Sequence, residues 1–269
     1  MKQIFALVFA LVSLSAQAWT QTAPLPVERC QVHNPYGWAQ TSKQATAICR
    51  RAYFVAYDAT AKIPVYVSYT LLPQNALGCF PRTNAFVADA SVPGGPRPDD
   101  YAGTGYDKGH AAPDGDMSWS QQVEYESFLM TNMSPQLPGL NRGIWKLLET
   151  ATGAWVYSRK HTLVVYAGNV YNTTASTTKR IGAGGVVVPD ALFKIIVDQQ
   201  TNEVYAFLFP HKENQGNDLS VVQSTVAAVE KASGITFPLP QGVDKNAKPA
   251  LWPVDFKSVA DAKKALCKG

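Results

Sequence analysis

The chain has 269 residues, of which 46% are hydrophobic and 16% are charged, as in a globular protein and unlike a disordered chain. Its formal net charge of +4 at pH 7 permits a polyanionic partner but does not require one, because nucleic-acid-binding proteins often have a stronger basic bias. Charge alone therefore fits any mildly basic globular protein.

The N-terminal segment has the pattern of a secretory signal peptide. Lys2 precedes an apolar run at residues 4–12, and small residues then predict cleavage after Ala18, so that residues 1–18 are removed. The apolar run is too short to serve as a stable membrane anchor. We therefore expect residues 19–269 to form a single domain that has no contact with a membrane and is periplasmic or secreted.

The cysteine content fits an oxidising compartment. An even number of cysteines in an exported chain predicts two disulfides, and the lack of a C-x-x-C motif argues against a zinc or redox site. Three pairings are possible. We favour the one in which the first bond closes a short local loop and the second tethers the C-terminal tail: Cys30–Cys49 and Cys79–Cys267.

The first half of the mature chain mixes irregular segments and strands. Residues 19–50 are rich in turn formers and are expected to be irregular. Residues 52–72 contain aromatic and β-branched residues in two runs, which predicts two strands joined by a turn at residues 58–62. A Gly/Pro-rich loop follows at residues 91–105, and residues 118–132 read as the start of a helix that continues into an extended segment.

The second half predicts helices and strands without a regular βαβ rhythm. A helix is expected at residues 138–151, with Pro138 at its start and Gly153 just beyond its end. A second, amphipathic helix is expected at residues 218–234, ending at Gly234. The irregular alternation favours the α+β class, with three buried strands between the helices at residues 162–171, 186–198 and 203–210.

Two segments carry residues that could form an active site. The stretch YDKGHAAPDGDM at residues 106–117 contains His110 and Lys108, although a lone histidine in a loop is more often structural than catalytic. In the helix expected at residues 138–151, Asn141 and Glu149 share one face with Trp145, and both offer oxygen atoms that suit Mg²⁺ or its waters. Alone, this face is more often an exposed polar surface beside a packed tryptophan.

Together the two segments resemble the DNA/RNA non-specific endonuclease family, the ββα-metal nucleases. The family's D-R-G-H motif is matched by Asp107-Lys108-Gly109-His110, and its T-N-x-x-P-Q motif by residues 131–136. The L-N, aromatic and L-E positions are matched by Leu140-Asn141, Trp145 and Leu148-Glu149, and the resemblance extends over residues 50–240.

The resemblance implies a central antiparallel sheet flanked by helices, with a β-hairpin and a crossing helix that place His110 opposite Asn141. It implies that His110 takes a proton from the attacking water. It also implies that Asn141 binds Mg²⁺ directly and that Glu149 binds it through water, with Mn²⁺ able to substitute for Mg²⁺. Arg82 would bind phosphate, or would be a surface arginine beside Cys79. Asn132 would support the site, or would be a structural turn residue.

Two departures from the family pattern bear on substrate binding. Lys108 replaces the usual arginine of the motif and loses its bidentate geometry, although it keeps the charge. Gly153 stands where the family often has a basic residue. The contact that this basic residue makes is therefore missing here or comes from Arg142 or Arg159. Asp107 is expected to fix its loop. The remaining histidines have no matching motif and are expected to be structural or exposed: His33, His161 and His211.

The sequence therefore predicts an exported, Mg²⁺-dependent, sugar-non-specific endonuclease that binds DNA and RNA through the phosphate backbone and leaves 5′-phosphates. Two alternatives stay open: a non-catalytic nucleic-acid binder on a decayed nuclease fold, and an exported toxin nuclease with a dedicated inhibitor protein. The sequence does not indicate the oligomeric state.

Overall fold

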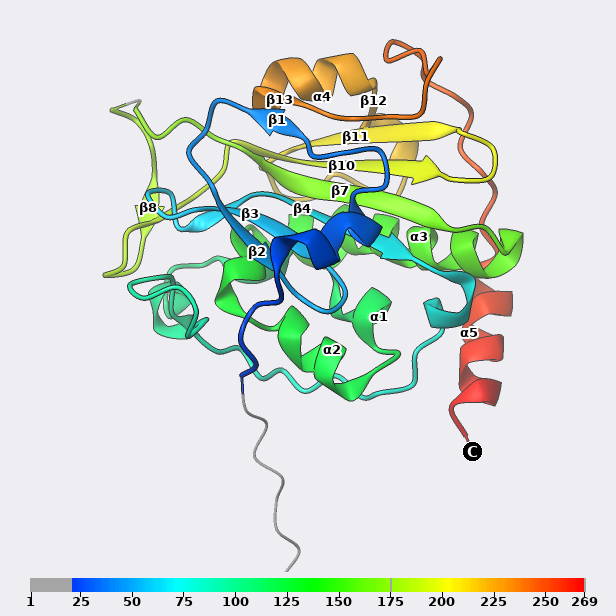
Figure 1. Ribbon diagram of the computed structural model, residues 1–269, viewed down its shortest axis with the longest axis horizontal. Coiled ribbons are helices and arrows are strands. Elements are labelled where there is room, and N and C mark those ends of the chain that lie inside the picture. The colour runs from blue at the N-terminus through cyan, green and yellow to red at the C-terminus, as the bar shows by residue number, and fades with distance from the viewer. Residues whose placement is uncertain (1–20, 175, 269) are drawn as a thin grey trace, which may run out of the picture.

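The computed structural model describes residues 21–174 and 176–268, so the expected signal peptide and its cleavage site lie outside the described residues. Its centre is a seven-stranded antiparallel sheet (Figure 1) with the strand order β12-β11-β10-β7-β4-β3-β2. The strands are β2 (Thr46–Cys49), β3 (Phe54–Asp58), β4 (Ile63–Leu71), β7 (Leu163–Val170), β10 (Ala191–Asp198), β11 (Val204–Pro210) and β12 (Gln223–Ser224).

Three two-stranded ribbons and several helices surround this sheet. The ribbons are β1 (Gln40–Thr41) with β13 (Ile235–Thr236), β5 (Asp107–His110) with β6 (Met133–Gln136), and β8 (Arg180–Ile181) with β9 (Val186–Val187). The α-helices are α1 (Asp114–Met117), α2 (Gln121–Ser127), α3 (Lys146–Arg159), α4 (Val226–Ser233) and α5 (Phe256–Leu266). The short helices are η1 (Val27–His33), η2 (Pro73–Asn75), η3 (Pro98–Tyr101), η4 (Met130–Asn132), η5 (Leu140–Trp145) and η6 (Leu219–Val221).

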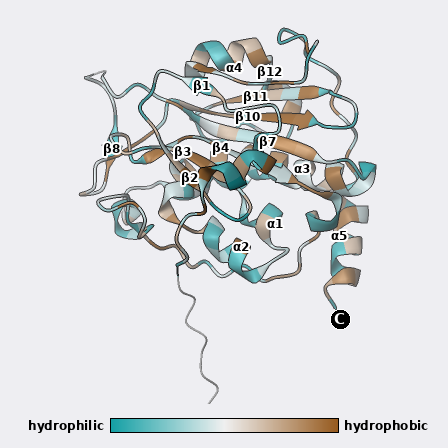
Figure 2. Cartoon of the chain, viewed as in Figure 1, coloured by the Kyte–Doolittle hydropathy of each residue, from teal (hydrophilic) through white to brown (hydrophobic). Residues whose placement is uncertain are grey.

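Both faces of the sheet are covered by other elements. Successive side chains of a strand point to opposite faces, so each central strand contributes to two cores. In β7, Val165 belongs to a core shared with Trp155 of α3, whereas Val164 belongs to a core shared with Val229 of α4. The central strands are therefore mostly apolar (Figure 2), which explains why their sequences read as long apolar runs. No helix within the described residues is long and apolar enough to cross a membrane.

The structure confirms the α+β class and most of the expected strands. The pair at residues 52–72 forms β3 and β4, and residues 162–171 and 203–210 form β7 and β11. The strand expected at residues 186–198 is split into β9 and β10. Pro189 lies in the break, and it has no N–H to donate to a ladder.

Both predicted helices have different limits from those expected. The first opens as the π-helical turn η5, contains Gly143 in a non-helical conformation, and continues as α3 past Gly153 to Arg159. The second is only α4, because the Thr225 side chain caps its start by accepting a hydrogen bond from the N–H of Ala228, 3.1 Å away. The residues before this cap form η6 and β12 instead, while Gly234 ends the helix as expected, with φ of 70°.

Two further differences concern the chain ends. Residues 19–50, expected to be irregular, contribute strand β2 to the sheet edge, and α5 was not expected at all.

Both favoured disulfides are present, Cys30–Cys49 and Cys79–Cys267, and the described residues contain no free cysteine. The first bond is completely buried, whereas both cysteines of the second are exposed.

Candidate active site

The ribbon of β5 and β6 carries the motif histidine. The two strands are antiparallel, with His110 opposite Met133 and Gly109 opposite Ser134. A Cβ atom at Gly109 would lie only 2.2 Å from the Cδ of Gln136, so the ribbon can pack in this way only because residue 109 has no side chain. The motif glycine thus sets the position of the strand that ends in His110.

His110 lies in an aromatic setting and is only 7% exposed. Its ring centroid is 4.8 Å from that of Phe128, edge to face, and 5.6 Å from that of Phe86. Burial lowers the pKa of His110 to about 4. The charge of Asp114 raises this pKa and that of Arg82 lowers it, both by less than burial does. The imidazole is therefore neutral at physiological pH, and its Nε2 has no hydrogen-bond partner among the described residues.

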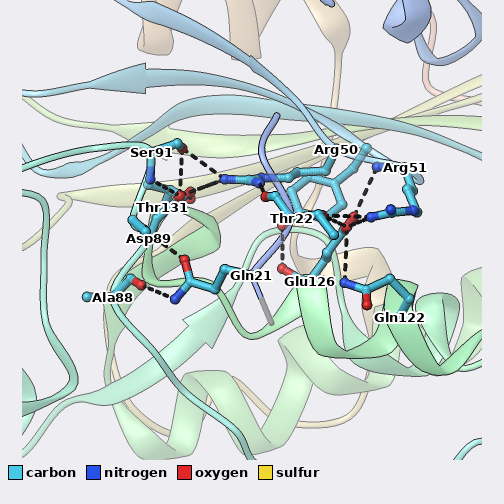
Figure 3. A network of polar contacts seen from close by, with 12 residues as sticks. Gln21, Thr22, Arg50, Arg51, Ala88, Asp89, Ser91, Gln122, Glu126 and Thr131 are labelled. Carbon is cyan, nitrogen blue, oxygen red and sulfur yellow. Dashed lines mark hydrogen bonds and ion pairs between the residues drawn. The ribbon is translucent and has the colours of Figure 1, made fainter. Parts of the chain in front are cut away.

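A buried polar network lies behind this strand. Asn132 is completely buried; its Oδ1 accepts from the N–H of Ala112 at 2.9 Å, and its Nδ2 donates to the Ala112 carbonyl at 2.8 Å. The neighbouring Thr131 hydroxyl donates to Asp89 at 2.6 Å, and Asp89 forms a buried ion pair with Arg50 at 2.6 Å (Figure 3). The network fixes the chain two residues beyond His110.

A cavity of about 530 Å³ opens in front of His110. Four other residues singled out for the site line it: Arg82, Lys108, Asn141 and Glu149. Asn132 is not part of its wall and can act only by positioning the chain. Five further lining residues had no motif to mark them: Phe86, Tyr106, Pro113, Asp114 and Lys146. Of these, Lys146 could have been inferred, because it lies three residues before Glu149 on the same helix.

Asn141 is oriented by the aspartate of the motif. Its Nδ2 donates to Asp107 at 2.9 Å, which leaves Oδ1 as the free acceptor of the amide. Arg142 donates to both carboxylate oxygens of Asp107, at 2.8 and 2.6 Å. Burial would raise the pKa of Asp107, but these hydrogen bonds outweigh it and lower the pKa. Asp107 therefore stays ionised and binds the side chains of Asn141 and Arg142 in the first turn of η5.

Glu149 lies over a buried lysine. Lys194 is completely buried, and its Nζ is 3.9 Å from Glu149 and 4.5 Å from the centre of the Trp145 ring. Burial raises the pKa of Glu149, and the charge of Lys194 opposes this. The Oε1 of Glu149 is buried without a hydrogen-bond partner among the described residues. A buried oxygen in this state is suited to a cation or to an ordered water.

Positive charge reaches the cavity from several segments. Arg82 pairs with Asp114 and stacks on Phe128, with its guanidinium 4.9 Å from the ring centre. Lys108 lies 5.0 Å over the Phe86 ring. Arg142 also lines the cavity, but Asp107 binds it.

Arg159, suggested as a substitute for the missing basic residue at Gly153, lies away from the cavity. It contacts Asp198 and Glu203 at the other end of α3. Its guanidinium also stacks on Trp252, 4.1 Å from the ring centre. These contacts explain why it cannot replace a residue at position 153.

The other histidines do not line the cavity. His33 is buried and accepts from the N–H of Thr70 at 3.3 Å. His161 is 2.7 Å from Asp198, and His211 is 2.6 Å from the Pro189 carbonyl. All three therefore have structural contacts.

The donor set of the cavity fits a hard divalent cation. The free Oδ1 of Asn141 and the carboxylate of Glu149, both on residues that line the cavity, offer oxygen atoms, which Mg²⁺ prefers. No group of three or more His, Cys, Asp or Glu side chains within residues 21–174 and 176–268 could hold a metal by itself. A metal here would have few protein ligands.

An antiparallel ribbon ending in a buried histidine, crossed by a helix with an asparagine and a glutamate, defines a ββα-type nuclease. Comparison with known proteins agrees. The sequence profile of the DNA/RNA non-specific endonuclease family matches residues 33–245. The chain therefore belongs to this family of metal-dependent hydrolases.

Relatives of known name are similar over different lengths. Nuclease C1 of Cunninghamella echinulata var. echinulata is 32% identical over 51% of this chain and 59% of its own length. Human mitochondrial endonuclease G is 27% identical over 70% of this chain and 68% of its own, and a Nostoc nuclease is 27% identical over 81% and 83%. The solved EndoG/EndoGI complex contains a chain with TM-score 0.69 and 25% identity, covering 80% of this chain and 93% of that one.

Proposed function

We propose that the chain is an exported, Mg²⁺-dependent endonuclease that cuts DNA and RNA and leaves 5′-phosphates. The observation that carries the proposal is the single cavity shared by His110, Asn141 and Glu149 with the cations Arg82 and Lys108. The nuclease relatives support it. The proposal also treats residues 19–269 as one nuclease domain.

His110 would be the general base. Its pKa, lowered to about 4, keeps the ring neutral, and a neutral imidazole has one ring nitrogen that can accept a proton from the attacking water. The flanking rings of Phe86 and Phe128 restrict the imidazole to one orientation. A base held in this way loses little freedom when the substrate arrives.

Asn141 would hold Mg²⁺ directly and Glu149 would hold it through water, with Mn²⁺ able to substitute. When bound, the metal would stabilise the negative charge that develops on the phosphate and on the leaving oxygen. Asp107 supports this role because it binds the amide nitrogen of Asn141 and so directs the amide oxygen away from itself.

Substrate recognition would rest on phosphate contacts. Arg82 and Lys108 are the cations beside His110, and contacts to phosphate carry no base sequence. A site that reads only the backbone fits both DNA and RNA. The inhibition described for the EndoG/EndoGI complex supports an inhibitor protein as a partner of this chain as well.

Export is supported by two features. The N-terminal pattern of the sequence is that of a signal peptide, and both cysteine pairs are oxidised. We therefore place the mature protein in the periplasm or outside the cell.

The test is digestion of supercoiled plasmid and of RNA by the mature protein, with Mg²⁺ and with EDTA. Both substrates should be cut only with the metal. Asn141→Ala should lose most of this activity and remain folded, whereas Asn246→Ala, which changes an exposed asparagine outside the cavity, should cut as the wild type does. Equal cleavage in EDTA would contradict metal dependence, and binding without any cleavage would favour the non-catalytic alternative.

A further inference from the structure

The active-site cavity continues into a second one of about 310 Å³. The two share Arg82, Asp114, Lys146 and Glu149 on their walls. The second cavity runs from there between α3 and α5. A polynucleotide with one phosphate at His110 therefore has a continuous groove in which its chain can proceed.

Gly153 keeps this groove open. It lines the second cavity, and a Cβ atom there would come no closer than 3.6 Å to Asp116. A long side chain at this position would project into the space between the two helices. Instead, Lys146 of α3 and Lys263 of α5 supply positive charge to the same groove.

The two lysines are not neutralised by salt bridges. Within the part of the chain that the structure describes, neither Lys146 nor Lys263 forms an ion pair, and both are exposed. The acidic residues of the groove have other partners: Asp114 pairs with Arg82, and Glu149 lies 3.9 Å from Lys194. Asp116 is 5% exposed and accepts from the hydroxyl of Tyr69 at 2.8 Å, although the charge of Lys263 also lowers its pKa. The two ammonium groups are therefore available to an anionic ligand.

Helix α5 is attached mainly through its ends. Before it, Trp252 is fixed by an edge-to-face contact with Tyr205 and by the hydrogen bond from the Trp155 indole to its carbonyl, 3.1 Å long. After it, Cys267 is bonded to Cys79. The helix lies beside α3 (Figure 1), but it has 11 residues and buries none of them.

An isolated helix of that length is only marginally stable in water. The disulfide lies four residues, about one turn, beyond Lys263. The position of Lys263 over the groove therefore depends on the Cys79–Cys267 bond.

We propose that Lys263, held in place by the Cys79–Cys267 disulfide, binds a phosphate of the nucleic acid next to the one that is cleaved, together with Lys146. The inference rests on the proposed nuclease function and extends it to the path of the substrate. Two ammonium groups on opposite walls of a groove suit the backbone of a polynucleotide, because phosphates follow one another along it.

The test measures binding of a DNA duplex in EDTA at several salt concentrations. Each phosphate contact contributes about −0.9 to the slope of log K against log salt. Lys263→Ala should therefore make the slope shallower by about one contact and weaken binding by as much as about eightfold at 0.1 M salt.

Lys264→Ala is the matched control, because it removes the same charge from the same helix but from a residue outside the groove. It should leave the slope and the affinity nearly unchanged. Equal slopes for wild type, Lys263→Ala and Lys264→Ala would overturn the phosphate contact.

A second variant tests the tether. Cys79→Ser with Cys267→Ser should lose as much affinity as Lys263→Ala, and adding Lys263→Ala to it should cost nothing more. Wild-type affinity of the tether variant would overturn the role of the disulfide. If that variant does not fold, the comparison of Lys263→Ala with its control still decides the phosphate contact.

Binding in EDTA does not require catalysis, so the two proposals can fail separately. If the wild type cuts DNA with Mg²⁺ but Lys263→Ala binds as the wild type does, only the present inference is wrong. If the wild type neither binds nor cuts nucleic acid, the proposed function is wrong, and this inference falls with it.

Discussion

At the scale of single residues, His110 combines burial with an unpartnered nitrogen. Structural histidines in this chain use their ring nitrogens: His33 accepts from a backbone N–H, and His211 contacts a carbonyl. The Nε2 of His110 has no such partner within the described residues, although His110 lines the cavity. Leaving a buried polar atom without a partner costs stability, which fits a site shaped for reaction.

We expect His110→Ala to lower kcat by at least about 10²-fold, the usual minimum effect of removing a positioned general base. DNA affinity should change little, because Lys108 and Arg82 remain. The melting temperature should fall, because the variant loses the ring contacts with Phe128 and Phe86, so the rates are compared at a temperature where both proteins are folded. Cleavage rate, affinity and melting temperature should be measured on one preparation.

A structural histidine would give another pattern. Cleavage would then fall only as far as the folded fraction falls. A stable His110→Ala variant that cuts near the wild-type rate would contradict the catalytic role.

The motif spacing in the sequence singled out the residues proposed for the reaction but not their surroundings. His110, Asn141 and Glu149 were found because they occupy motif positions, and all three line one cavity. Phe86 and Phe128 could not be found, because they approach His110 through the fold and belong to no motif.

At the scale of elements, the β5–β6 ribbon is the part of the site most sensitive to packing. Gly109 lies against Gln136, a completely buried side chain whose amide has no hydrogen-bond partner within the described residues. The ribbon has only four residues in each strand, so a local clash cannot be spread over many contacts. A shift of β5 would move His110 directly.

We expect Gly109→Ala to reduce the free energy of unfolding by about 1–3 kcal/mol, the usual cost of overpacking. Activity should fall as well, because the new methyl group displaces either Gln136 or the strand that carries His110. Gln136→Ala creates space at the same point, so the double variant should recover part of both losses.

Denaturant unfolding and cleavage rates of the two single variants and the double variant give the coupling between the positions. Strictly additive losses would show that Gly109 and Gln136 do not compete for the same space. The close approach of β5 and β6 would then not be the reason for the glycine.

The elements that the sequence predicted correctly are those whose signal is local. Strands β3, β4 and β7 consist mostly of apolar and β-branched residues. The helix expected at residues 218–234 was too long because Gln223 and Ser224 pair with β11, a contact that local periodicity does not contain. The face predicted for Asn141, Trp145 and Glu149 assumed a regular helix, but Gly143 interrupts it, and Trp145 is buried.

At the scale of the whole molecule, two disulfides bond segments near the two ends of the described residues to more central parts of the chain. Cys30–Cys49 joins η1 to strand β2 and is buried. Cys79–Cys267 spans 188 residues and fixes the end of α5 beside the groove. The sequence favoured the first pairing for its short loop and the second as a tether of the tail. It could not show that the second bond lies at the end of a helix whose Lys263 lines the groove, because that depends on the path of α5.

The stability of the molecule should depend on pH through His33. Burial lowers the pKa of His33 to about 4, whereas a histidine in an unfolded chain has a pKa near 6.5. Between these values the unfolded chain binds a proton that the folded chain does not, so the free energy of unfolding falls as the pH falls. From pH 7 to pH 5, His33 alone should cost about 2 kcal/mol.

Other groups contribute to the same curve and must be separated from His33. His110 acts in the same direction, because its pKa is also lowered, while the raised pKa values of Asp116 and Glu149 act in the opposite direction. The informative quantity is therefore the difference between the wild type and His33→Gln, in which the glutamine can still accept from the N–H of Thr70. Denaturant unfolding of both proteins at pH 7 and pH 5 should show a smaller loss for the variant. If the two proteins lose the same free energy, then His33 is already protonated in the folded state at pH 5, and its burial does not exclude the charge.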